Sequence, residues 1–178
     1  EFEEHGGRGH GLSLYRELLQ VAWLLWWPGH VREGTLIGEN ASLIDVFPTL
    51  AELAGAPEPA QVEGRSLAAA LAAKPARAQP HGRTLFAQRV GAATGQELWA
   101  VVQGDWKLIE RASARELYDL RERAEREDLA ARHPEIVERL AARLVEFRAR
   151  AKPLASERVD IQLDAREVDA LRQLGYTK

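Results

Sequence analysis

The chain contains no cysteine and no methionine among its 178 residues, and it has no long apolar run. The lack of cysteine excludes a disulfide, a thiolate metal ligand and a cysteine nucleophile within these residues. The longest apolar run, Val21–Trp27, falls well short of the ~18 residues that a membrane-spanning helix needs, so no transmembrane segment is expected. Because methionine is absent even from position 1, we expect the natural sequence to continue upstream of Glu1.

A strong excess of charge of one sign is also lacking. The formal net charge is only −3, with 24 basic and 27 acidic side chains. A nucleic-acid-binding protein usually carries a basic surface, so no nucleic-acid partner is expected. Apolar residues make up 46% of the chain and charged residues 29%, which is typical of a globular protein with a buried core.

The first part of the chain has the pattern of an α/β fold. Val21–Trp27 is apolar throughout and ends in a Pro-Gly pair, as expected for a strand that is covered on both faces in a parallel sheet. Ser42 and Asp45 have the spacing of a capping box, and Gly55 suits a left-handed stop, so a helix is predicted between them. We therefore interpret Asp45 as a residue that starts a helix, in preference to an acid or base.

The second part of the chain has the pattern of a small antiparallel sheet with one long helix. Gly104-Asp105 separates two strand candidates and predicts a tight hairpin. The strand candidates are Thr84–Gln88, Leu98–Gln103, Trp106–Glu110 and Glu116–Leu120. A long helix is predicted from Pro134 to just before Pro153, and a tail helix follows over residues 163–176.

Titratable side chains gather in the glycine-rich start of the chain, EFEEHGGRGHGL, which is predicted to be a loop. His10 lies between two glycines, where an imidazole could donate to an anionic oxygen or protonate a leaving group. A solvent-exposed loop histidine is the alternative. His5 could bind or support a metal, but one histidine and two adjacent carboxylates do not make a metal site. Arg8 could hold an anion or be an ordinary surface guanidinium.

Several longer stretches occur in a characteristic order. They are EFEEHGGRGHGLSLYRELLQVAWLLWWPG, SLIDVFPTLAELAGAPEPAQVEGRSL, LWAVVQGDWKLIE, ELYDL and LDAREVDALRQLGY. Together they closely resemble the C-terminal part of sulfatases in the alkaline-phosphatase-like superfamily. The resemblance implies an α/β fold, in which residues 1–75 form the C-terminal end of the α/β sulfatase core. Residues 76–178 would form a C-terminal subdomain of short antiparallel strands, a packed long helix and a tail helix.

The resemblance also implies the activity of a sulfuric ester hydrolase. Sulfatases use a formylglycine nucleophile and Ca²⁺, and the matching positions lie outside this chain, with the nearest metal ligands expected just upstream of Glu1. His10 matches a Lys or His of the family that contacts the sulfate and assists the leaving group, so it is the candidate for catalysis and substrate binding. His5 matches a loop histidine of this branch and is a second candidate for substrate binding. The chain alone is expected to be inactive.

Two other functions stay open, namely a related phosphodiesterase, phosphonate hydrolase or phosphotransferase, and a noncatalytic interaction module. The partner that the resemblance implies is a sulfated small molecule or glycan. Without neighbouring strands, Val21–Trp27 would expose a strand edge and apolar surface. We therefore expect either a homodimer or a companion N-terminal portion that covers it.

Overall fold

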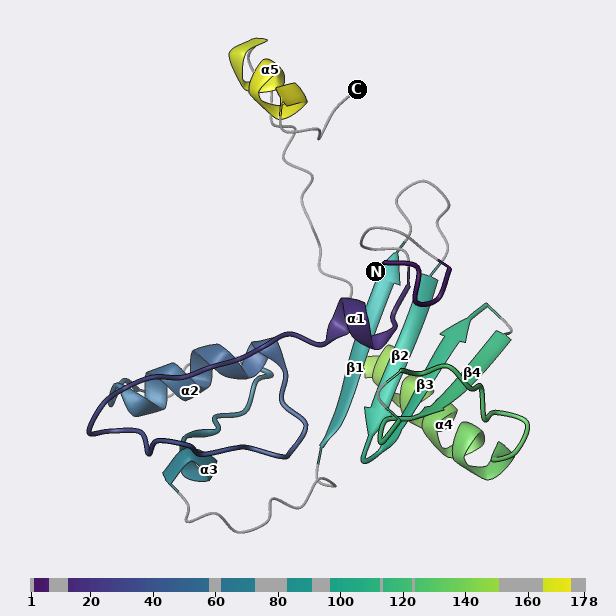
Figure 1. The fold of residues 1–178 in the computed structure, drawn as a ribbon, viewed down its shortest axis with the longest axis horizontal. Helices are drawn as coiled ribbons and strands as arrows, with labels where there is room; N and C mark the ends of the chain where they lie inside the picture. The colour runs from purple at the N-terminus through teal and green to yellow at the C-terminus, as the bar shows by residue number, and fades with distance from the viewer. Residues whose placement is uncertain are drawn as a thin grey trace.

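A computed structural model describes most of the chain, with helices at both ends of the described part and one antiparallel sheet between them (Figure 1). The described residues are 2–6, 13–57, 62–72, 83–90, 97–112, 114–122, 124–150 and 165–173. The elements are α1 (Arg16–Leu19), a 3₁₀ helix η1 (Leu43–Asp45), α2 (Val46–Leu53), α3 (Ala68–Ala72), β1 (Thr84–Val90), β2 (Glu97–Gln103), β3 (Trp106–Arg111), β4 (Ala114–Asp119), α4 (Pro134–Arg150) and α5 (Ala165–Gln173). None of the helices in these residues is long and apolar enough to cross a membrane.

The sheet confirms the four predicted strands and their hairpin. Its order is β1-β2-β3-β4, and each neighbouring pair is antiparallel. Gln103 pairs with Trp106, so the turn between β2 and β3 has two residues, and Gly104 adopts the positive φ of 59° that such a turn requires. The result is a compact sheet of consecutive strands.

One face of the sheet packs against α4. Leu140 and Leu144 of the helix are fully buried, and the inward side chains of the strands surround them. The buried residues of this core are Trp99, Val101, Leu108, Leu117, Val137, Leu140, Ala141 and Leu144. The ring of Phe147 stacks on Phe86 of β1 with a centroid distance of 4.1 Å. The apolar stripe predicted for the long helix is therefore confirmed.

The opposite face of the sheet packs against the N-terminal segment. Side chains alternate along a strand, so residues next to those of the α4 core point to this second face. They are Leu98, Ala100, Ile109 and Tyr118, and they bury Leu14, with Tyr15 beside it. Figure 1 shows α1 beside β1 and β2, while α2 and α3 lie to its left. Through Leu14 and Tyr15 the sheet thus joins the segment before α1 to the C-terminal half of the chain.

The predicted helix after Ser42 is confirmed together with its start signal. Ser42 and Asp45 form a reciprocal capping box, η1 leads into α2, and Gly55 follows the helix with a φ of 68°. The buried Asp45 carboxylate also accepts hydrogen bonds from the Arg65 backbone N–H at 2.8 Å and from the Arg83 side chain. These bonds fasten α2 to the loop that follows it.

The predicted strand at Val21–Trp27 is wrong. These residues form no helix or strand, and Leu24 and Trp26 are 91% and 83% exposed. A strand is stabilised by backbone hydrogen bonds to a neighbour, and the sheet among the described residues contains only β1 to β4. The fold is therefore mixed α/β, with an antiparallel sheet covered by helices, and the apolar run lacks the parallel neighbours that its sequence pattern predicts.

Candidate functional site

The candidate site is the junction between the N-terminal segment and the second face of the sheet. His5 is the predicted site residue that the structure describes. His10 and Arg8 lie within residues 7–12, outside the described residues. The geometry around His5 therefore carries the description of this site.

His5 is held on three sides. Its Nδ1 lies 2.7 Å from Oε1 of Glu17 in α1, and its Nε2 lies 2.9 Å from the backbone oxygen of Glu125. Its ring also stacks on Tyr15, with centroids 3.8 Å apart and planes inclined by 13°. A direct contact between His5 and a substrate stays a prediction, and it would require one of these two hydrogen bonds to open.

The surroundings of His5 raise its pKa above the ordinary value. Burial by itself lowers the pKa, because it disfavours the charged ring. The hydrogen bond to the Glu125 carbonyl and the hydrogen bond and charge of Glu17 act in the opposite direction and outweigh burial. The junction thus favours the protonated imidazolium.

Glu125 contacts three other residues of the junction, namely His5, Arg16 and Lys107. It lies in the connection between β4 and α4, is almost fully buried, and has a positive φ of 45°. Its side chain accepts a hydrogen bond from the Arg16 backbone N–H at 2.9 Å and two from Lys107 Nζ at 3.0 Å. Burial lowers the pKa of Lys107, and the Glu125 charge opposes that shift. A left-handed backbone at a non-glycine residue is strained, so these contacts hold a costly conformation.

A second polar cluster lies on the other side of Tyr15. The Tyr15 and Tyr118 hydroxyls both donate to Oε2 of Glu116, at 2.8 and 2.9 Å. Burial and this carboxylate raise the pKa of Tyr15 to about 12 and raise that of Tyr118 further. Both phenols therefore remain protonated donors at neutral pH, and they bind α1 to β4.

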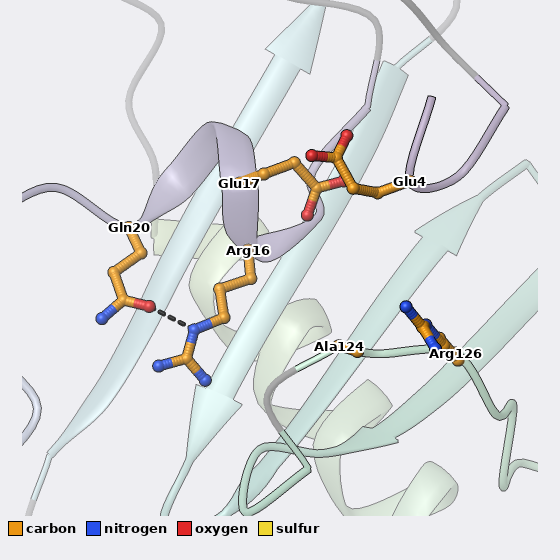
Figure 2. Close-up of a pocket in the computed structure, with 6 residues that line it drawn as sticks. All are labelled: Glu4, Arg16, Glu17, Gln20, Ala124 and Arg126. Carbon is orange, nitrogen blue, oxygen red and sulfur yellow. Dashed lines mark hydrogen bonds between the residues drawn. The ribbon is translucent and has the colours of Figure 1, made fainter. Parts of the chain in front are cut away.

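A cavity of about 390 Å³ opens beside this junction. Its lining residues are Glu4, Arg16, Glu17, Gln20, Ala124 and Arg126 (Figure 2). Figure 2 shows the Arg16 guanidinium turned toward Gln20, with which it is hydrogen-bonded. The lining contains two acidic and two basic side chains, so it does not select strongly for an anion or a cation.

The described residues do not fit a metal ion. No three His, Cys, Asp or Glu side chains among them lie close enough together to hold one. His5, Glu17 and Glu125 are engaged with each other or with Lys107. The charged and hydrogen-bonded side chains of this junction therefore hold the N-terminal segment against the sheet and the connection before α4.

Sequence reasoning identified His5 but missed its partners. The position of Lys107 could have been predicted from the sequence. Lys107 and the buried Ile109 are two residues apart in β3, so their side chains lie on the same buried face of the sheet. No sequence pattern predicts the contact of Glu125 with His5, because Glu125 lies in a connection and is 120 residues from His5 along the chain. Only the folded arrangement brings these residues together.

Comparisons with known proteins place these observations in a family. Residues 8–150 match the family model described as N-sulphoglucosamine sulphohydrolase, C-terminal. Human arylsulfatase D is 38% identical over 61 residues, a match that covers 33% of this chain and 10% of the relative. The chain thus corresponds to a small share of that relative's length.

Two solved structures share the fold. A 2-O GAG sulfatase is 25% identical with a TM-score of 0.53, over 68% of this chain and 27% of that chain. A protein in complex with its substrate D-glucosamine-2-N,6-O-disulfate is 20% identical with a TM-score of 0.52, over 69% of this chain and 27% of that chain. Structural relatives of this chain therefore bind sulfated sugars.

Proposed function

The chain belongs to the N-sulphoglucosamine sulphohydrolase C-terminal family, and from this premise we propose that it is the C-terminal part of a sulfatase that hydrolyses sulfate esters. The family match over residues 8–150 is the observation that carries this proposal. The substrate class that we propose is a sulfated sugar. The name of one solved relative and the substrate complex of the other support that choice.

His10 is the residue of this chain that we propose to act on the substrate. An imidazole can donate a hydrogen bond to a sulfate oxygen and can protonate the departing alcohol near neutral pH. The glycines on either side of His10 allow a bulky anionic group to come close to the backbone. His10 would thus serve both binding and proton transfer.

The nucleophile and the metal ligands are proposed to come from residues outside this chain. Sulfatases use a formylglycine and normally a metal ion, and the described residues contain no group that fits a metal. On this proposal the 178-residue chain is inactive alone and contributes His10 to a site that another portion completes.

The same proposal accounts for the exposed apolar side chains of residues 21–27. A companion N-terminal portion would cover Leu24 and Trp26, which are exposed in this chain. A homodimer is the alternative cover. Sedimentation of the chain alone and with the companion portion separates the two, because only a homodimer forms without the companion.

The test compares the complete protein, including its upstream sequence, with this chain alone. With Ca²⁺ present, the complete protein is expected to release sulfate from an aryl sulfate and from a sulfated glucosamine, and the chain alone is not. His10→Ala should lower kcat by about 10²- to 10⁴-fold, the usual contribution of a general acid. His30→Ala is the matched control, since His30 is an exposed histidine that stacks on Trp27.

Three results would contradict the proposal. Turnover of a phosphodiester or phosphonate without sulfate release would indicate the related hydrolase class. No turnover by the complete protein on any of these esters would favour a noncatalytic module. Turnover by this chain alone, unchanged in His10→Ala, would contradict both the division of the site and the role of His10.

A further inference from the structure

We propose that His5 is a positioning residue, which as an imidazolium clamps residues 2–6 to α1 and to the connection before α4. The clamp is a property of this chain, and only its effect on turnover rests on the proposed function. The proposal rests on the atoms that surround the imidazole ring of His5. Both ring nitrogens of His5 face acceptors, Oε1 of Glu17 at 2.7 Å and the Glu125 carbonyl oxygen at 2.9 Å.

The number of protons on the ring follows from these acceptors. A backbone carbonyl oxygen cannot donate, and an ionised carboxylate cannot donate either. A neutral imidazole carries one N–H, so it can satisfy only one of the two contacts and turns a lone pair toward the other acceptor. Both contacts are satisfied when His5 carries two N–H groups and a positive charge, with the Glu17 carboxylate as its counter-charge.

The groups packed around His5 are consistent with a cation at this position. Those that face the ring or lie behind its partners are Glu17 and Arg16 of α1, Tyr15 before α1, Glu125 before α4, Lys107 of β3, and Glu4 of its own segment. The Lys107 charge is balanced by the Glu125 carboxylate, and the Arg16 guanidinium is hydrogen-bonded to Gln20. Glu17, which is hydrogen-bonded to the ring, is the carboxylate that balances His5, and the exposed Glu4 adds a further negative charge nearby.

The clamp links three parts of the chain at one point. His5 belongs to residues 2–6, Glu17 belongs to α1, and Glu125 belongs to the C-terminal part that also holds the Arg16 N–H. Chain connectivity makes Gly6 and Ser13 the two ends from which residues 7–12 must start and finish. The clamp thus fixes against the sheet the two described segments that flank His10 in the sequence, residues 2–6 and 13–19.

The clamp has a defined pH dependence. Because the folded-state pKa of His5 is raised, the clamp stabilises the docked segment fully below the pKa of an unfolded histidine, near 6.5. The stabilisation is lost as the pH rises through the folded-state pKa. Docking therefore weakens above pH 6.5, as the pH passes through the raised folded-state pKa of His5.

The first test measures the ring itself by NMR on the 178-residue chain. We expect the His5 ring to titrate above 6.5, and Glu17→Gln to move its pKa downward by removing the counter-charge. The Arg16 amide signal should follow the His5 titration, because both groups contact Glu125. Glu52→Gln, on an exposed position of α2, is the control and should leave the His5 titration unchanged.

The second test measures turnover in the complete protein. His5→Phe keeps a ring to stack on Tyr15 but removes both hydrogen bonds, and we expect kcat/KM to fall by about 10- to 100-fold, since misplacing a catalytic group by about 1 Å has such effects. Glu17→Gln should shift the alkaline limb of the pH profile to lower pH. A simple loss of folding would not produce that shift.

The outcomes separate the clamp from the proposed function. A His5 ring that titrates at or below 6.5 and does not respond to Glu17→Gln overturns the clamp, whatever the enzyme does. A raised, Glu17-dependent titration in a protein without sulfatase activity supports the clamp and overturns the proposed function. Unchanged kcat/KM and pH profile in both variants of an active sulfatase overturn the positioning role.

Discussion

The Nζ atom of Lys107 lies 3.0 Å from each carboxylate oxygen of Glu125, and both side chains are almost completely shielded from solvent. A charge pair in this position gains little net stability over an apolar pair, because both ions lose their hydration. Removing one partner is strongly destabilising, because the other charge is then left buried without compensation. The pair therefore makes the junction sensitive to single substitutions.

Lys107→Met should destabilise the chain by about 3–5 kcal/mol, the usual result of breaking a buried ion pair. Urea unfolding measures the change. The control is Arg132→Met, because Arg132 pairs with Glu127 at 2.8 Å but both side chains are more than half exposed. Exposed pairs contribute less than about 1 kcal/mol. Equal losses in the two variants would contradict the buried, compensated pair. The double variant Lys107→Met/Glu125→Leu should regain only part of the loss, because the Arg16 N–H then loses its acceptor.

Asp45→Asn should remove part of the acid sensitivity of the fold. Burial alone raises the pKa of Asp45, but hydrogen bonds from Arg83, Arg65 and Ser42 outweigh it, so the folded-state pKa is lowered. A lowered pKa gives stability that is present above the ordinary Asp pKa and is lost as the pH falls through the folded-state value. We expect the unfolding free energy of Asp45→Asn to depend less on pH below the ordinary Asp pKa of about 4. An identical slope in the wild-type chain and in Asp45→Asn would argue against this role.

Gly64→Ala should disrupt the loop that docks on α2. A Cβ at Gly64 would lie 1.9 Å from the Ile44 backbone oxygen, a distance that forces the backbone to move. The comparison is Gly55→Ala, where φ is 68° but no atom lies within 4 Å of the added Cβ. Strain alone should cost roughly 1–2 kcal/mol at Gly55, and the clash at Gly64 should cost more. Thermal unfolding of the two variants tests the order, and a smaller loss at Gly64 would refute it.

Leu140→Ala should leave a cavity between α4 and the sheet. Leu140 is fully buried among the side chains of that core, and such truncations cost about 2–5 kcal/mol. Val145→Ala changes a side chain of the same helix that is 62% exposed and should cost less than about 0.5 kcal/mol. Denaturant midpoints for the pair check the prediction. Similar midpoints would mean that α4 is not packed as described.

The elements predicted correctly are those whose signals are local. The capping box at Ser42 and Asp45, the hairpin glycine at Gly104 and the stripe around Leu140 each lie within one or two turns of the chain. Backbone geometry and side-chain spacing decide such features, so a few neighbouring residues suffice to reveal them.

The features that sequence could not supply depend on distant partners. The apolar pattern of Val21–Trp27 predicts what these residues would do beside other strands, and says nothing about whether those strands are present. His5 and Glu125 illustrate the same limit, because no local pattern links residues so far apart. The role of His10 in sulfate binding stays a prediction for a related reason, since His10 lies outside the described residues.

The alternation of side chains in β3 also determines which pairing register the sheet can adopt. Lys107 faces the N-terminal segment and Leu108 faces α4, both with almost no exposure. A slip of one residue along β2 or β4 would exchange the two faces, placing an ammonium group among the leucines of α4 and a leucine against the Glu125 carboxylate. Both exchanges are heavily unfavourable, because each would bury a charge without a partner. Lys107 thus disfavours strand pairings that are out of register by one residue.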